Sequence, residues 1–200
     1  MDYFVKKLSE QKEREGRVRQ FFDSELIPAL NSKNTITFDL EIGCGHGHWL
    51  NHYSKLNSSN VFVGIDLISK RIRKANSKKI KQNNENLFFL KSEASEFLQS
   101  IPEGLKISNI FLFFPDPWPK KRHHKRRLIQ SSFLDLLHSC TNDKSKFYFR
   151  TDHLEYFQWV TLKIEKNEFW KSSNSKFPFA HHSYFQQLLP NFSSIIASRK

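Results

Sequence analysis

The sequence predicts an α/β fold with a doubly wound, mostly parallel sheet. Five short runs rich in β-branched or aromatic residues alternate with segments whose apolar residues recur at helical spacing. Parallel strands need crossover connections, so this alternation favours helices on both faces of the sheet. A length of 200 residues with 38% hydrophobic content suits one compact domain. Residues 1–34 are interpreted as a basic arm with a preliminary helix, and residues 35–200 as the sheet domain.

The elements are expected in the following chain order. Residues 1–19 form a charged arm that would grip RNA or be disordered, and Phe21 to Leu30 forms a short helix. The predicted strands are TITFDLEI (35–42), VFVGID (61–66), NLFFLKS (86–92), ISNIFLFF (107–114) and KFYFRTD (146–152). The predicted helices cover 48–56, 68–82, 95–101, 126–139 and 153–166. The segments 169–173 and 193–200 are predicted to add strands that form an antiparallel edge.

The charge balance narrows the class of partner. The formal net charge of +12 comes from 32 Lys and Arg against 20 Asp and Glu, which favours a polyanion such as nucleic acid or an acidic membrane surface. No apolar run approaches the roughly 20 residues of a membrane span, and the charged start does not resemble a signal peptide. Cys44 and Cys140 are far apart, so the sequence predicts neither a disulfide framework nor a metal site. We therefore expect a cytoplasmic protein that acts on nucleic acid and not on a membrane.

The first predicted strand runs into three glycines at alternate positions, in Glu41-Ile-Gly43-Cys44-Gly45-His46-Gly47. Glycine at a strand-to-helix turn permits positive φ and lets a ligand approach the backbone. A dinucleotide fingerprint would place the third glycine one residue later. The loop resembles the E/D-x-G-x-G-x-G loop of class I methyltransferases, in which S-adenosylmethionine lies against the glycine turn. The resemblance implies that Glu41, Gly43 and Gly45 bind the cofactor; the alternative is a glycine-rich turn without a ligand.

Acidic residues follow the next two predicted strands. Asp66 ends the second strand, where a carboxylate can accept both ribose hydroxyls of an adenosine cofactor. Its alternative role is a helix N-cap. Glu93 follows the third strand, and in methyltransferases of this type an acidic residue there often lies near the adenine amino group. Its alternative role is an exposed carboxylate in the first turn of the next helix.

The fourth predicted strand ends in Pro115-Asp116-Pro117-Trp118-Pro119, whose prolines predict a stiff loop. The next eight residues, 120–127, carry six Lys or Arg and two His, a density that attracts phosphates. A solvated charged face is the alternative for this run. Trp118 is interpreted as stacking on a nucleobase or as packing under the loop.

The segment FFPDPWPKKRHHKRR resembles the F-F-P-D-P-W-x-K-x-x-H-x-K-R-R signature of tRNA (guanine-N7) methyltransferases, and with Thr151-Asp152 the resemblance spans about residues 36 to 160. It implies an enzyme with a Rossmann-like class I fold that methylates guanine N7 in tRNA, at the variable-loop guanine numbered 46 in tRNA. It implies S-adenosylmethionine as cofactor and tRNA as partner. We expect a monomer or homodimer, with no obligatory partner evident from the sequence. It makes Asp116 the catalytic residue, next to the cofactor, and it places Lys120 and Asp152 at the substrate. Trp118 and Arg122 are further substrate-binding candidates.

The C-terminal part departs from the family pattern. A T-x-x-E element that contacts substrate is expected there, and the nearest candidate is Ser175-Lys176-Phe177-Pro178, which lacks the carboxylate. Ser175 is kept as a substrate-binding candidate. His181, His182 and Tyr184 are polar replacements, of which the two histidines are interpreted as surface residues. Two other functions remain open: another RNA or DNA base methyltransferase, and an RNA-binding module without catalysis.

Overall fold

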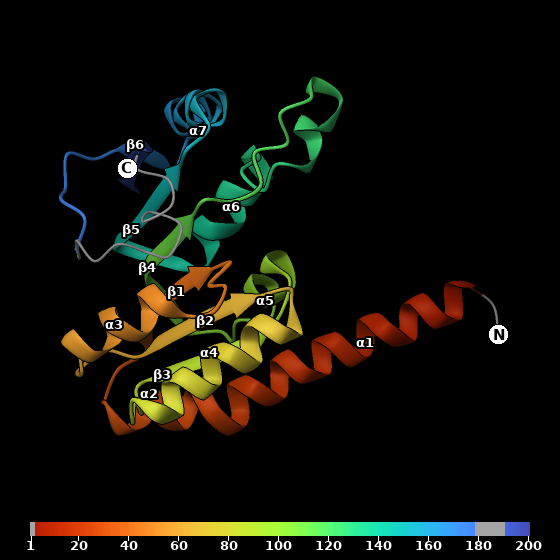
Figure 1. Cartoon of the computed structure of the whole chain (residues 1–200), viewed down its shortest axis with the longest axis vertical. Helices are drawn as coiled ribbons and strands as arrows, with labels where there is room; N and C mark the ends of the chain where they lie inside the picture. The colour runs from red at the N-terminus through yellow and green to blue at the C-terminus, as the bar shows by residue number, and fades with distance from the viewer. Residues whose placement is uncertain (1–2, 179–190) are drawn as a thin grey trace.

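A computed structural model describes residues 3–178 and 191–200. Its seven-stranded sheet has the order β3-β2-β1-β4-β5-β7-β6 (Figure 1). The strands are β1 (Thr37–Ile42), β2 (Phe62–Asp66), β3 (Leu87–Lys91), β4 (Lys106–Phe113), β5 (Thr141–Thr151), β6 (Trp170–Ser172) and β7 (Ser193–Arg199). The first five strands are parallel, and β7 is antiparallel to both of its neighbours. The predicted doubly wound sheet with an antiparallel edge is confirmed.

Helices cover both faces of this sheet. One face packs against α3 (His48–Leu56) and α4 (Ser69–Lys81), whose buried side chains include Trp49 and Ala75. The other face packs against α5 (Ala94–Gln99), α6 (Ser131–Ser139) and α7 (Leu154–Lys166), together with the N-terminal helices. Aromatic rings fill much of the interior, as in the stacked pairs Trp49–Tyr53 and Phe111–Tyr148. Within the described residues, no helix is long and apolar enough to cross a membrane.

The N-terminal segment differs from the expected arm with a short helix. Helical structure begins at Tyr3 and continues through α1 (Tyr3–Phe21), a π-helical turn (Phe22–Leu26) and α2 (Ile27–Ser32). Val18, Phe21 and Phe22 are buried on the sheet side, and the Phe22 ring lies 5.2 Å from that of Phe97. The buried end anchors the helix, and the preceding Lys, Glu, Gln and Arg residues extend it because they are good helix formers. Figure 1 shows α1 running out beyond the sheet toward the N-terminus.

A buried carboxyl group lies in the middle of the sheet. Asp39 of β1 is 1% exposed, and its Oδ1 accepts a 2.9 Å hydrogen bond from Asn109 Nδ2. Its Oδ2 is buried without a hydrogen-bond partner. Burial therefore raises the pKa of Asp39 from 3.8 to about 7, although the bond from Asn109 acts in the opposite direction. Between about pH 4 and 7, the folded protein therefore holds a proton here that the unfolded chain releases.

Replacing Asp39 by Asn should make the free energy of unfolding less dependent on pH between about pH 5 and 8. Because the pKa is raised from 3.8 to about 7 on folding, the stability from the protonated carboxyl is complete below pH 3.8 and is lost as pH rises through about 7. Between about pH 5 and 8 the wild type should lose about 2–3 kcal/mol more than Asp39→Asn, since one pKa unit corresponds to about 1.4 kcal/mol and the loss extends over about two units. Urea unfolding at both pH values measures this difference, and parallel pH dependences of the two proteins would contradict it.

Candidate active site

The candidate residues gather at the carboxyl edge of the parallel strands. Gly43 follows β1, Asp66 ends β2, Glu93 follows β3, Asp116 follows β4 and Asp152 follows β5. Parallel strands end at the same edge of a sheet, which is where open α/β sheets bind their ligands. The Gly43 and Cys44 amides both donate to the Ile65 carbonyl, at 2.8 and 3.0 Å, so the glycine turn is tied to the end of β2.

The three glycines of the turn all have positive φ, +74° at Gly43, +55° at Gly45 and +67° at Gly47. Their surroundings differ. A Cβ atom at Gly43 or Gly45 would meet no atom within 4 Å, whereas one at Gly47 would lie 2.5 Å from the Phe89 ring. Gly47 is the N-cap residue of α3 and packs tightly, while the other two glycines leave open space above the turn. A ligand can therefore approach the backbone at Gly43 and Gly45.

Asp66 is 5% exposed and holds this turn against β2. Its Oδ2 accepts a 3.0 Å bond from the Gly45 amide and lies 3.4 Å from Arg71 Nη1. Its Oδ1 accepts a 2.8 Å bond from the Ile68 amide. The alternative role of Asp66 as a helix N-cap is wrong, because Ile68 occupies that position of α4. The structure thus brings Asp66 and the glycine turn into direct contact.

Glu41 lies beneath the turn. It is 5% exposed, and its Oε2 is buried without a hydrogen-bond partner. Burial, with a smaller contribution from the negative charge of Asp66, raises the pKa of Glu41 to about 8. A buried carboxyl oxygen without a partner is costly unless a ligand or water supplies a hydrogen bond.

Glu93 is the N-cap residue of α5. Its Oε2 accepts bonds from the amides of Ser95 and Glu96, at 2.9 and 3.0 Å. The carboxylate therefore stabilises the start of α5 as an N-cap. It is half-buried and precedes the first turn, so it differs from the exposed first-turn carboxylate of the alternative interpretation. Both of these bonds use Oε2, so Oε1 is left for another donor.

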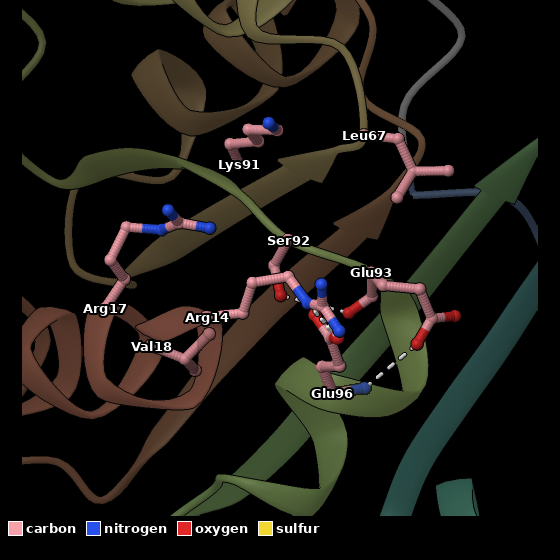
Figure 2. A pocket seen from close by; sticks show the side chains of 8 residues that line it. All are labelled: Arg14, Arg17, Val18, Leu67, Lys91, Ser92, Glu93 and Glu96. Atoms are coloured by element: carbon pink, nitrogen blue, oxygen red, sulfur yellow. Dashed lines mark hydrogen bonds and ion pairs between the residues drawn. The ribbon is translucent and has the colours of Figure 1, made fainter. Parts of the chain in front are cut away.

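A pocket of about 340 Å³ opens beside Glu93, between α1 and the ends of β2 and β3. Figure 2 shows Arg14 reaching from α1 toward Ser92 and Glu93, with its guanidinium paired to Glu96 at 2.6 Å. The remaining lining residues are Arg17, Val18, Leu67 and Lys91. The contribution of α1 was missed from the sequence, although the apolar spacing of Val18, Phe21 and Phe22 indicates a helix face anchored on the sheet.

Arg127 supports the proline-rich loop. It is 1% exposed, and its Nε donates a 2.8 Å bond to the Pro117 carbonyl. Its Nη2 lies 3.3 Å from Glu155 Oε1, and its guanidinium lies 5.1 and 5.2 Å from the ring centres of Tyr156 and Trp159. The sequence analysis included Arg127 in the basic run that is expected to attract phosphates. For Arg127 this prediction is wrong. The side chain is a buried anchor of the loop.

The loop itself contains two non-glycine residues in the left-handed region. Phe114 has φ +52° and Trp118 has φ +45°, so each lies two residues from Asp116. Such conformations cost about 1–3 kcal/mol each and cluster at functional sites. The loop is fixed at its start, where the Phe114 amide donates a 2.8 Å bond to the Arg150 carbonyl. Asp116 is thereby held in an exposed position between two constrained residues.

The basic segment after the loop is a 3-10 helix, Lys121–Arg126, and the helix predicted over 126–139 begins only at Ser131. The Arg126 guanidinium lies 5.0 Å from the Trp118 ring centre, and the His123 ring meets Trp118 edge-on at 5.8 Å. Trp118 thus contacts the 3-10 helix that follows its loop and stays half-exposed, so stacking on a nucleobase and packing under the loop both remain predictions. Lys120 and Arg122 are exposed, as is Asp152 on the neighbouring strand end.

Arg150, two residues before Asp152 in the chain, is buried near the end of β5. Its guanidinium lies 3.9 Å from the ring centre of Phe177, and burial lowers the pKa of Arg150 to about 10. This contact brings the segment after β6 toward the site. Ser175, two residues earlier, shares a 2.8 Å hydrogen bond with the Ser173 hydroxyl. His181, His182 and Tyr184 lie outside the described residues.

Known proteins resemble this chain in sequence and in fold. A family model described as a putative methyltransferase matches residues 36–183. The tRNA (guanine-N(7)-)-methyltransferase of Prochlorococcus marinus strain AS9601 is 30% identical over 177 residues, 86% of this chain and 83% of that protein. The chain belongs to the tRNA (guanine-N(7)-)-methyltransferase family. The member from Leptospira interrogans is 34% identical over 160 residues, 76% of this chain and 73% of that protein.

Solved structures agree on the fold of this family member. A precorrin-6y C5,15-methyltransferase from Geobacter metallireducens superposes with a TM-score of 0.55 at 12% identity, over 86% of this chain and 85% of that one. A ribosomal protein L11 methylase from Lactobacillus delbrueckii superposes with a TM-score of 0.54 at 12% identity, over 82% and 70%. At such low identity these likenesses concern the fold alone, and they confirm the predicted Rossmann-like class I methyltransferase architecture.

Alanine substitution of the tightly packed Gly47 and of the open Gly43 should lower the free energy of unfolding by different amounts. Gly47→Ala should lower the free energy of unfolding by about 2–4 kcal/mol, because positive φ strains alanine and the Phe89 ring must move. Gly43→Ala has the same backbone strain without the clash and should cost about 1 kcal/mol. Denaturant unfolding of both variants gives the comparison. Equal losses would show that Phe89 does not pack on Gly47 as described.

Proposed function

We propose that the protein transfers the methyl group of S-adenosylmethionine to N7 of a guanine in tRNA. The observation that carries this function is the juxtaposition, at one sheet edge, of an open glycine turn and the constrained Asp116 loop. Membership of the tRNA (guanine-N(7)-)-methyltransferase family supports the same reaction. The family resemblance points to the variable-loop guanine numbered 46 in tRNA as the target.

The residues around the turn fit S-adenosylmethionine. Gly43 and Gly45 leave open backbone, and Glu41 has a buried oxygen without a partner. Asp66 would accept the ribose hydroxyls with the remaining lone pairs of its carboxylate. Glu93 would accept the adenine amino group through Oε1. When bound, the cofactor supplies a methyl group that its sulfonium makes electrophilic, and these residues hold and orient it.

The reaction needs alignment and no base. Guanine N7 carries a lone pair and no proton, so the chain must bring N7 into line with the methyl group. Asp116 would accept hydrogen bonds from the guanine donors and offset the positive charge that develops on the ring. Its exposed position between Phe114 and Trp118, with Arg127 beneath, suits a residue that positions a base brought from outside.

The substrate roles divide among exposed and packed residues. Lys120 and Arg122 are exposed and would contact tRNA phosphates, and Asp152 would contact the substrate from the end of β5. Trp118, already packed against Arg126, would support the loop and offer its remaining face to the tRNA. Ser175 would approach the substrate through the segment that Phe177 ties to Arg150. We further propose a cytoplasmic monomer or homodimer that needs no obligatory partner.

The function is tested by incubating the protein with labelled S-adenosylmethionine and tRNA from cells that lack the modification, followed by nucleoside mass spectrometry. We expect label in 7-methylguanosine. Label on an exocyclic amine or a ring carbon would overturn the specific reaction, and RNA binding without transfer would identify a module that is not an enzyme.

Gly43→Ala should separate cofactor binding from folding. The added methyl group would enter the open space above the turn without meeting a protein atom, so the protein should fold but bind S-adenosylmethionine at least about tenfold more weakly. Isothermal titration calorimetry measures the dissociation constant. An unchanged dissociation constant for S-adenosylmethionine would show that the cofactor does not bind at this turn.

Asp116→Ala should abolish methyl transfer and leave the cofactor affinity within about twofold of wild type, because the side chain acts on the guanine and not on the adenosine. Single-turnover transfer to tRNA and calorimetry with S-adenosylmethionine give the two values. Turnover close to that of wild type would exclude a positioning role for Asp116.

A further inference from the structure

Helix α4 carries a concentration of positive charge that neither the cofactor turn nor the Asp116 loop uses. Its 13 residues, SKRIRKANSKKIK, contain no acidic residue. Its basic residues are Lys70, Arg71, Arg73, Lys74, Lys78, Lys79 and Lys81. By contrast, α1 alternates basic and acidic residues and forms the Glu13–Arg17 pair along its own surface. The charge of α4 has no such compensation within the helix.

Three of the seven basic residues have partners that fix them. Arg71 pairs with Asp66. Lys78 donates a 3.1 Å bond to the His46 carbonyl and also contacts His48. Lys79 lies over the Phe88 ring at 4.4 Å. The contacts of Arg71 and Lys78 place one edge of α4 beside the glycine turn, and Lys79 contacts β3.

The remaining four, Lys70, Arg73, Lys74 and Lys81, form what we call the α4 basic face. All four are exposed, and they lie opposite the buried Ile72 and Ala75. Among the described residues, none of the four forms an ion pair with an acidic side chain. The outer face of the helix is therefore an uncompensated strip of positive charge.

This arrangement costs free energy in the isolated protein. Like charges at i and i+4, such as Lys70 with Lys74 and Lys74 with Lys78, destabilise a helix. Burial lowers the pKa of both Lys78 and His46, and the positive charge of Lys74 lowers these pKa values further. A phosphate backbone along the face would convert this repulsion into attraction.

The position of the face relates it to the site. The helix begins three residues after Asp66, so its first turn lies at the carboxyl edge of the sheet. At about 1.5 Å per residue, Lys70 and Lys81 are roughly 16 Å apart, which is enough to follow several phosphates. Figure 1 shows α4 beside β2 and β3, whereas the basic 3-10 helix follows β4 in the other half of the sheet.

We propose that the α4 basic face is a second contact surface for the phosphate backbone of tRNA, away from the methylated guanine. The proposal rests on the proposed function, and it assigns to tRNA a surface that binds without taking part in methyl transfer. An acidic membrane is the weaker partner, because helices that lie on membranes bury an apolar face, whereas Ile72 and Ala75 of α4 are already in the core and Ile80 alone is a large exposed apolar residue of this helix.

The test is the triple variant Lys70→Gln, Lys74→Gln and Lys81→Gln, which keeps good helix formers at all three positions. The matched control is Lys144→Gln, Lys166→Gln and Lys171→Gln, which removes three exposed lysines outside α4. At about 0.1 M salt the test variant should raise the KM for tRNA about tenfold. The slope of log affinity against log salt should become shallower by about 2, since each phosphate contact contributes about 0.7–0.9.

The kcat at saturating tRNA and the affinity for S-adenosylmethionine should stay within about twofold of wild type in both triple variants. The control should keep the wild-type KM. Equal KM values for the test and control variants would overturn the proposal. It would also be overturned if the wild type and the control bound phosphatidylserine vesicles and the test variant did not, while the tRNA affinity of the test variant was unchanged. Direct titration of tRNA binding applies even if the wild type methylates no tRNA, so failure of this surface and failure of the proposed function are distinguishable.

Discussion

The hydrogen bond from the Gly45 amide to the Asp66 carboxylate joins the ends of β1 and β2, and the site is arranged around it. It requires a turn in which glycine adopts positive φ, and it requires the two strands to end in register, with Ile42 opposite Ile65. Since Asp66 also accepts the Ile68 amide, the same carboxylate sets the start of α4. One buried acid thus orients the turn, the helix after it and the surface that the helix presents.

The proline-rich loop that carries Asp116 is held by a different set of contacts. Arg127 is a buried cation whose Nε bonds the Pro117 carbonyl while Tyr156 and Trp159 lie near its guanidinium. Such an anchor lets Phe114 and Trp118 stay in the left-handed region, because the fold fixes the loop on both sides. Asp116 is therefore placed by packing behind it, and its own side chain remains exposed. Rigid support behind an exposed acid is what a reaction governed by alignment needs.

The sequence predicted the parts of this arrangement that depend on local pattern. Alternating strands and helices, the three glycines and the proline-rich loop each have a short-range signature, and they follow one another in the expected order, although the helix predicted over 126–139 begins only at Ser131. The errors concern residues whose environment is tertiary. Arg127 and Lys120 belong to the same charged run in the sequence. Only the packing against α7 shows that Arg127 is buried, whereas Lys120 is exposed. The length of α1 was also missed, because only its last residues, Val18 and Phe21, have apolar helical spacing, and the charged residues before them have none.

The central claim is that the chain aligns guanine N7 with a methyl donor and removes no proton. The most direct measurement is the single-turnover rate of methyl transfer to tRNA at saturating S-adenosylmethionine, between about pH 6.5 and 8.5, where the protein remains folded. Alignment alone predicts a rate that varies by less than about threefold. A rate that rises about tenfold for each pH unit would indicate a general base in the rate-limiting step and would contradict the account.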